Sequence, residues 1–221
     1  MLTPQVIAAL TEAARAANAH DTSRALSSVR ELLGDKAAVC EPLLHALARR
    51  GSELQRLREL ARRDPLTGAG NRRTFEEELA RESARHRRTH EPFAVILLDL
   101  DDLKARNDGF GHAAGDQALV ALTQACQQTV RETDLVARLG GDEFAVLLPG
   151  SNHAGASALA ARLRARIEQA EAEGGGLRVS LGVAAAEHGR LEVDLVTTIA
   201  DRDLYRDKAQ RKQRSANEFA A

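Results

Sequence analysis

The feature that most constrains this chain is a pair of adjacent glycines between two apolar runs. Leu135-Val136 precedes Gly140-Gly141, and a longer apolar run at 144–148 follows. Because glycine adopts positive φ angles at no steric cost, this pattern predicts a β-hairpin with a tight turn. Two carboxylates, Asp142 and Glu143, stand side by side directly after the glycines. Their mutual repulsion predicts that a cation binds at this turn.

The second half of the chain supplies the elements of a small mixed sheet. A continuous apolar run at 93–98 predicts a buried strand, and the alternation at 179–183 predicts a half-buried strand. Helices are expected after the polar, glycine-rich loop 104–116 and over 154–173. The order β-α-β-β-α-β fits a ferredoxin-like sheet with its helices on one face, preceded and followed by a further helix. The predicted fold class is therefore α/β (α+β).

This topology places the acidic end of the first strand beside the hairpin. Asp99 and Asp101 end that strand and are expected next to Asp142 and Glu143. Converging carboxylates bind hard divalent cations, above all Mg²⁺, and two such ions serve phosphoryl and nucleotidyl transfer. Acids at strand ends also occur in solvated loops, and glycines with acids occur in exposed hairpins. In this topology the combination favours a metal site.

Several polar residues near this site are candidates for binding a nucleotide. Lysine is rare, with four among 31 basic residues, and Lys104, Lys208 and Lys212 can each reach a phosphate. Asn107 and Asp116 can read the edge of a nucleobase. Side chains of this kind also stabilise loops through bonds to the backbone, which is the alternative interpretation.

The first part of the chain predicts helices alone. Residues 1–62 carry helical periodicity, with about two and a half heptads in their later part, too few to choose between a coiled-coil stalk and a packed helical hairpin. We expect a regulatory or dimerisation segment at 1–62, a catalytic domain at 63–213 and a polar tail at 214–221. The signal that the first segment receives is not specified.

Composition excludes several classes of protein. Aromatic residues make up 3% of the chain, which argues against base-stacking modules, and the net charge of −1 gives no reason to expect nucleic acid or a membrane as partner. The sequence contains no transmembrane stretch and no signal pattern. Cys40 and Cys126 fall far apart on apolar helix faces, so we expect buried thiols in a cytoplasmic protein.

Gly140-Gly141-Asp142-Glu143-Phe144 resembles the signature of the GGDEF-domain diguanylate cyclases, which join two GTP molecules into cyclic di-GMP. The resemblance covers about residues 62–213. It includes the family's entry loop at 64–72, its metal segment at 99–104 and its guanine loop at 107–116. Two later motifs of the family are matched at 179–183 and 200–208. It implies a palm-type GGDEF sheet covered by helices.

The resemblance also implies roles for individual residues. The expected metal ligands, for two Mg²⁺ per half-site with Mn²⁺ as an alternative, are Asp99, the Leu100 carbonyl, Asp142 and Glu143. The expected catalytic residues are Asp142, as proton acceptor from the 3′-hydroxyl, Glu143 and Lys104. The expected GTP-binding residues are Leu103, Lys104, Asn107, His112, Asp116, Gly140, Gly141, Lys208 and Lys212. For His112, a substrate contact or a loop-stabilising role is preferred over general base. Lys212 replaces the arginine usual in the family, which retains the charge but not the bidentate fork.

An Arg-x-x-Asp segment resembles the family's inhibitory product site. It consists of Arg131 and Asp134, with Arg162 as the second arginine, and a surface ion pair is the alternative interpretation. The resemblance implies a homodimeric cyclase that binds GTP as substrate and cyclic di-GMP as product and inhibitor, with an unknown upstream regulator. Two alternatives are a non-catalytic receptor for GTP or cyclic di-GMP, and a cyclase making a different cyclic dinucleotide.

Overall fold

The computed structural model describes residues 37–172, 175–187 and 195–219. The chain divides into two compact units, Met1–Ala61 and Arg62–Ala221. Helix α3 (Ala37–Arg62) is the described part of the first unit and confirms the helix predicted there. Residues 1–36, where helices were also expected, and the side chain of Cys40 lie outside the described residues.

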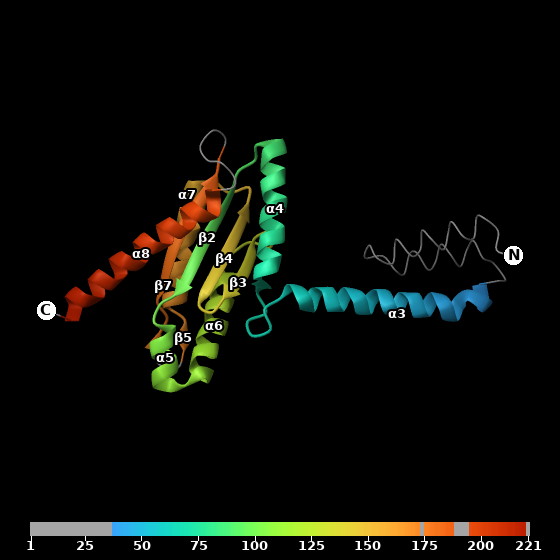
Figure 1. Ribbon diagram of the computed structural model, residues 1–221, viewed down its shortest axis with the longest axis horizontal. Coiled ribbons are helices and arrows are strands. Elements are labelled where there is room, and N and C mark those ends of the chain that lie inside the picture. Colours follow the sequence, from blue (N-terminus) through green and yellow to red (C-terminus); the bar gives the residue numbers. More distant parts are fainter. Residues whose placement is uncertain (1–36, 173–174, 188–194, 220–221) are drawn as a thin grey trace. The chain divides into compact units, whose positions relative to one another are not determined.

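The second unit is built around one mixed sheet (Figure 1). Its strands lie in the order β1-β3-β4-β2-β7, together with a separate two-stranded hairpin β5-β6. The strands are β1 (Gly70–Asn71), β2 (Phe93–Leu100), β3 (Leu135–Gly140), β4 (Glu143–Pro149), β5 (Glu171–Ala172), β6 (Gly175–Gly176) and β7 (Val179–Ala186). The helices are α4 (Arg72–Thr89), α5 (Leu103–Phe110), α6 (His112–Gln127), α7 (His153–Glu168) and α8 (Val196–Phe219).

The four long strands have the ferredoxin-like order that the sequence predicted. Strand β2 pairs antiparallel with both β4 and β7, and β3 pairs antiparallel with β4. The short β1 adds to β3 in parallel. The first predicted strand therefore lies beside the central hairpin, which confirms the placement on which the metal hypothesis depends.

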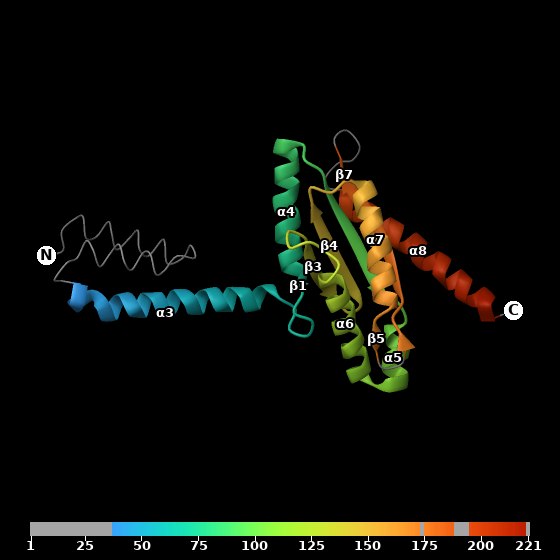
Figure 2. The same cartoon turned by 180° about the vertical axis from the view of Figure 1, so that it is seen from behind.

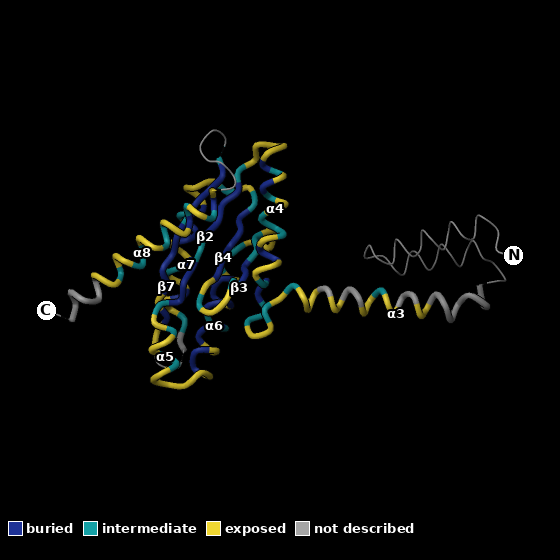
Figure 3. The backbone as a smooth tube through the Cα atoms, in the orientation of Figure 1, coloured by how far each residue is buried: buried dark blue, intermediate teal, exposed yellow. Residues whose placement is uncertain are grey.

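Helices cover both faces of the sheet, not one. Side chains alternate along β2, so Ile96 faces the core formed with α6 and α7, whereas Val95 faces a second core. This second core includes Phe75 of α4 and Val196 of α8, the two helices outside the β-α-β-β-α-β repeat. Figures 1 and 2 show the two helical layers from opposite sides, and the sheet between them is the most buried part of the domain (Figure 3).

Strand β7 was expected to be half-buried, and this prediction is wrong. Its burial pattern has seven buried residues and one of intermediate exposure, because α7 packs on one face and α8 on the other. A Cβ atom added at Gly182 would overlap the carbonyl oxygen of Ala200 and the backbone nitrogen of Leu204. Glycine at 182 thus lets α8 lie directly against the strand.

Asn71 caps α4, because its side chain accepts a hydrogen bond from the Thr74 backbone nitrogen. Two local predictions also change. The predicted loop 104–116 consists of α5 and the first turn of α6, joined at Gly111 with φ of +85°. Helix α7 ends at Glu168, before the predicted end at 173, whereas α8 continues through the first six residues of the expected polar tail, 214–219.

Cys126 is free and buried on α6, as predicted, and burial raises the pKa of its thiol to about 12. Across the described ranges, no helix has both the length and the apolar composition needed to cross a bilayer.

Candidate active site

On the second face, Glu143, Asp99 and Ser180 form a row across β4, β2 and β7, which we call the acidic row after its two carboxylates. In the sheet register, Asp99 of β2 is opposite both Glu143 of β4 and Ser180 of β7. Directly opposite residues of antiparallel strands project from the same face. The Leu100 backbone nitrogen also donates a 3.0 Å hydrogen bond to the Asp142 carbonyl oxygen, which fixes the turn against the end of β2. The structure therefore brings together the four residues expected to bind metal.

Lys208 of α8 points at this row. Its Nζ lies 2.8 Å from both carboxylate oxygens of Asp99, a residue only 8% exposed. Burial lowers the pKa of Lys208, but the hydrogen bond to Asp99 and the charges of Asp99, Asp142 and Asp101 outweigh it, and the pKa is raised. Lys208 is accordingly a fixed positive charge at the acidic end of the sheet.

Asp101 is held by two further side chains. The Ser180 hydroxyl donates to its Oδ1 at 2.8 Å, and Arg211 Nε lies 3.5 Å from its Oδ2. Burial raises the pKa of this carboxyl, against the opposing effects of Ser180 and Arg211. Arg211 also pairs with Glu168 at 2.5 Å, while Lys212, the predicted phosphate ligand, is exposed. The arginine thus faces the acidic row, one position before the predicted lysine.

Glu143 is paired with an arginine of the first helix of the domain. Arg72 lies 3.5 Å from a carboxylate oxygen of Glu143, and its Nε donates to the Leu139 carbonyl at 2.8 Å. The side chains of Arg72 and Glu143 are each more than half exposed. Glu143 therefore remains accessible from solvent beside the turn.

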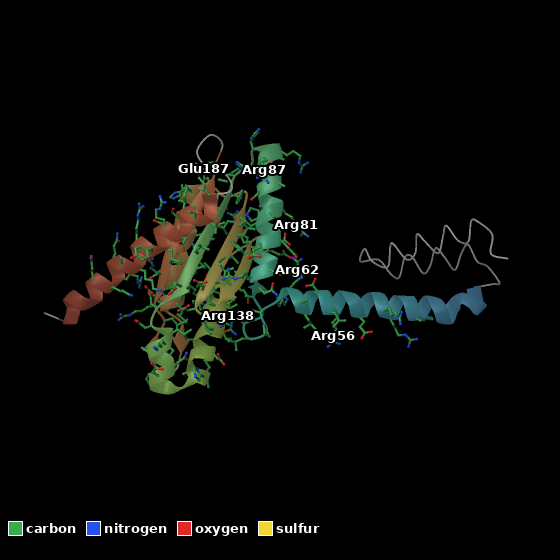
Figure 4. All side chains as sticks on the ribbon, viewed as in Figure 1. Arg56, Arg62, Arg81, Arg87, Arg138 and Glu187 are labelled. Carbon is green, nitrogen blue, oxygen red and sulfur yellow. The ribbon has the colours of Figure 1, made fainter. Side chains whose placement is uncertain are left out.

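Arg138 fixes the glycine turn from within. Gly140 and Gly141 have φ of +147° and +55°, and Arg138 donates two hydrogen bonds to the Gly141 carbonyl at 3.0 and 2.8 Å. A third contact, of 3.2 Å, joins Arg138 to Asp64. Burial raises the pKa of Asp64, but hydrogen bonds from Thr67 and Arg138 outweigh it and lower the pKa. Figure 4 labels Arg138 at the end of the sheet where this turn lies.

The oxygen donors present suit a hard divalent cation, although they are not assembled around one. Within the described ranges, no three side chains of His, Cys, Asp or Glu gather closely enough to hold a metal. Asp99 is occupied by Lys208 and Glu143 by Arg72. Carboxylates and a backbone carbonyl are the ligands that Mg²⁺ prefers. A cation bound at Asp99 would have to displace the Lys208 ammonium.

The predicted guanine loop forms a compact helical corner. Asn107 Oδ1 is buried without a hydrogen-bond partner, and a Cβ atom at Gly115 would overlap it. Buried side-chain oxygens usually have a hydrogen-bond partner, so this unpaired acceptor is a candidate ligand contact. Lys104, His112 and Asp116 are exposed. Leu103, which begins α5, packs partly against the core.

The Arg131–Asp134 segment forms a closed turn directly before β3. The Arg131 backbone nitrogen donates to Asp134 Oδ2 at 2.9 Å, and the Asp134 nitrogen donates to the Arg131 carbonyl at 3.1 Å. Arg162 of α7 reaches the Thr129 carbonyl at 3.3 Å, so the two predicted arginines border the same loop. Asp134 Oδ1 is buried without a partner.

A model of the diguanylate cyclase GGDEF domain matches residues 61–214. The chain belongs to the diguanylate cyclase GGDEF-domain family. It is 37% identical over 167 residues to the diguanylate cyclase DgcP of Pseudomonas aeruginosa, a match covering 74% of this chain and 25% of DgcP. The chain spans 25% to 55% of the lengths of five curated relatives that it matches.

Solved GGDEF structures have the same fold. The coiled coil and GGDEF domain of DgcB from Caulobacter crescentus, in complex with c-di-GMP, superposes with a TM-score of 0.71 at 26% identity, covering 78% of this chain and 94% of that one. The diguanylate cyclase SiaD, in complex with its activator SiaC from Pseudomonas aeruginosa, gives a TM-score of 0.63 at 29% identity, covering 93% and 84%.

In this GGDEF domain, sequence reasoning missed the residues that hold the acids in place. Arg72 and Arg138 flank recognisable segments, but their partners are distant in sequence: Asp64 is 74 residues from Arg138. Arg211 could have been found, since a position three residues after Lys208 lies on the same face of a helix. Ser180 required the strand register.

Proposed function

We propose that this GGDEF domain is a diguanylate cyclase that joins two GTP molecules into cyclic di-GMP and releases two pyrophosphates. The observation that carries the proposal is the convergence of Asp99, Lys208 and the Asp142 turn at one end of the sheet. Family membership and the homologous cyclases support the same chemistry. Its substrate, GTP, places the proposed reaction in the cytoplasm.

Each part of the site has a proposed role. Asp99, the Leu100 carbonyl, Asp142 and Glu143 bind Mg²⁺, two ions per half-site, or Mn²⁺ in its place. Bound Mg²⁺ supplies the charge that makes the 3′-hydroxyl more acidic and neutralises the phosphates. Asp142 accepts the proton of that hydroxyl, and Glu143 supports it. Lys104 and Lys208, with Arg211 or Lys212, hold the phosphates as charge-assisted donors.

The base is bound at the α5–α6 corner. Asn107 and Asp116 pair with guanine, with His112 and Leu103 alongside, and the glycines of the turn let the nucleotide approach the backbone. The unpaired, buried Asn107 Oδ1 supports this assignment, because an amide oxygen without a partner is stabilised when a ligand donates to it.

The product requires two protomers. Each GTP attacks the α-phosphate of the other, so one half-site cannot complete the ring and a homodimer is needed. Helix α3 precedes the domain, and the neighbouring DgcB structure contains a coiled coil, which supports a role for residues 1–62 in dimerisation and regulation. The activator of SiaD supports a protein regulator as one type of input.

Product inhibition is the second part of the proposal. Arg131, Asp134 and Arg162 would bind cyclic di-GMP through arginine contacts to guanine and phosphate. The DgcB neighbour contains c-di-GMP, and the exposed Arg131 beside an unpaired Asp134 oxygen supports such a site here.

One incubation tests the reaction. Purified chain is mixed with Mg²⁺ and GTP, and the product is identified by mass, for the wild type and for Arg131→Ala, which relieves inhibition. The proposal is supported if the wild type and Arg131→Ala both form cyclic di-GMP and the Asp99→Asn variant forms none. Bound nucleotide without product would favour a receptor, and a different mass would favour another cyclase. Sedimentation with and without residues 1–60 tests their role in dimerisation.

A further inference from the structure

The open edge of the sheet is covered by carboxylates of the last helix. Strand β7 ends the strand order, so its outward backbone groups lack a neighbouring strand. Asp207 of α8 accepts a 2.9 Å hydrogen bond from the Leu181 nitrogen, and Asp203, one turn earlier, accepts a 2.9 Å bond from the Val183 nitrogen. Side chains of α8 thus take the place of a sixth strand at two positions.

Asp207 joins three elements at this edge. The oxygen that accepts from Leu181 also lies 2.5 Å from a guanidinium nitrogen of Arg164 on α7. Helices α7 and α8 cover opposite faces of the sheet, so this ion pair passes around its edge. Among the described residues, Asp203 makes no ion pair with α7, so only Asp207 links α8 to both the strand edge and α7.

Polar contacts hold α8 at this edge in addition to its apolar packing in the second core. A groove of about 320 Å³ lies outside the edge, and its lining includes Arg164, Leu181, Asp203 and Asp207. Close contact at Gly182 sets how near α8 lies to the sheet, but a glycine offers no side chain to fix the rotation of the helix. The rotation matters because Lys208, next to Asp207, reaches Asp99 on β2.

We propose that Asp207 is a positioning residue: by binding Leu181 at the strand edge and Arg164 of α7, it fixes the turn of α8 that places the Lys208 ammonium on Asp99. The consequence for GTP rests on the proposed cyclase function. The placement of Lys208 does not, so it can be measured without any activity.

The test uses the four lysines of the chain, Lys36, Lys104, Lys208 and Lys212. Full-length protein is treated with trace acetic anhydride, and acetylation of Lys208 is measured by mass spectrometry relative to exposed Lys212. In the wild type, Lys208 reacts more slowly than Lys212 because its amine is held between the oxygens of Asp99. The Asp99→Asn variant gives the acetylation rate of Lys208 when its amine is no longer paired with the Asp99 carboxylate.

Asp207→Ala is expected to raise the Lys208:Lys212 labelling ratio about fivefold, the effect of losing one hydrogen bond of ordinary strength. Asp203→Ala removes a bond of the same type one turn away, and its ratio should stay within about twofold of wild type. Asp207→Asn retains an acceptor for Leu181 but loses the charge opposite Arg164, so it should give an intermediate ratio. It provides a second test of the proposal if Asp207→Ala does not fold.

The two aspartates separate positioning from general stability. A folded Asp207→Ala or Asp207→Asn protein with a wild-type labelling ratio overturns the proposal, as does an equal rise for Asp203→Ala. If the wild-type protein is an active cyclase, Asp207→Ala should also raise KM for GTP more than Asp203→Ala does. If the wild type makes no cyclic di-GMP, the proposed function fails while the labelling ratio still decides the role of Asp207.

Discussion

The acidic row and the Arg131–Asp134 turn are two charged sites of one domain that are built in opposite ways. In the acidic row, Lys208 and Asp99 are separated by 109 residues and meet only because α8 crosses the sheet. The Arg131–Asp134 turn closes over three residues through its own backbone. A site assembled over long range depends on the whole fold, whereas a local turn can be altered by itself. Mutations should therefore have coupled effects at the first site and separable effects at the second.

The largest effect is expected at the centre of the acidic row. Asp99→Asn removes a charge from the proposed metal and phosphate site, and kcat should fall about 10³-fold, as for loss of a group that stabilises transition-state charge. Asp102→Asn is the matched control: the same change in an exposed residue whose φ of +61° asparagine tolerates. Initial rates of pyrophosphate release compare them, and equal losses would argue against a special role for Asp99.

Arg138→Ala tests whether the long-range site is coupled to the fold. The change frees the Gly141 carbonyl and leaves Asp64 without its ion pair, so we expect kcat to fall about 10²-fold through misplacement of the turn. The free energy of unfolding should fall by about 2 kcal/mol. Denaturant melts and initial rates measure the two effects. Asp64→Asn, which leaves the Gly141 contacts in place, should cost less activity; the reverse order would contradict this role for Arg138.

The local turn should respond separately. Arg131→Ala should weaken inhibition by cyclic di-GMP at least about tenfold, the effect of losing charge-assisted hydrogen bonds, with little change in the initial rate. Inhibition constants measured with added cyclic di-GMP check this. Arg166→Ala is the control, since Arg166 is exposed as Arg131 is, but lies on α7 and binds the Gln128 side chain. An unchanged inhibition constant for Arg131→Ala would remove the product-site assignment.

The smallest effect distinguishes Arg211, which faces the acidic row, from its exposed neighbour Lys212. Arg211→Ala should raise KM for GTP by about three- to fivefold, as expected for a partly exposed ion-pairing residue. Lys212→Ala should change KM by less than about twofold, because surface substitutions have small effects. Michaelis–Menten kinetics at fixed Mg²⁺ measures both. A larger effect of Lys212→Ala would support the family-based assignment of the second phosphate contact.

Much of the fold was predictable because its strands carry local signals. The apolar run at 93–98 and the glycine pair at 140–141 specified β2 and the hairpin, and their adjacency followed from topology. The corner at 104–116 was mistaken for a loop, since Gly109 and Gly111 obscure helical periodicity although only Gly111 has a positive φ. Burial of β7 on both faces depends on where α8 packs, which periodicity in one strand does not report.

The residues of the candidate site were predictable from the sequence, but the residues that hold them in place were not. Asp99, Asp142 and Lys208 belong to contiguous motifs, so resemblance identified them. The pairing of Arg138 with Asp64, or of Asp207 with Leu181, joins residues whose positions carry no periodic or compositional signal. Such contacts are set by strand register and helix rotation, which are tertiary quantities.

The burial of Cys126 makes it practical to measure the association of two chains with a fluorescent label. Its thiol is buried, and with a pKa of about 12 it contributes almost no thiolate at neutral pH. With Cys40 replaced by serine, a cysteine introduced at exposed Arg88 would be the single site for a thiol-reactive dye. Energy transfer between donor- and acceptor-labelled chains would then report whether two chains associate as proposed, and how fast.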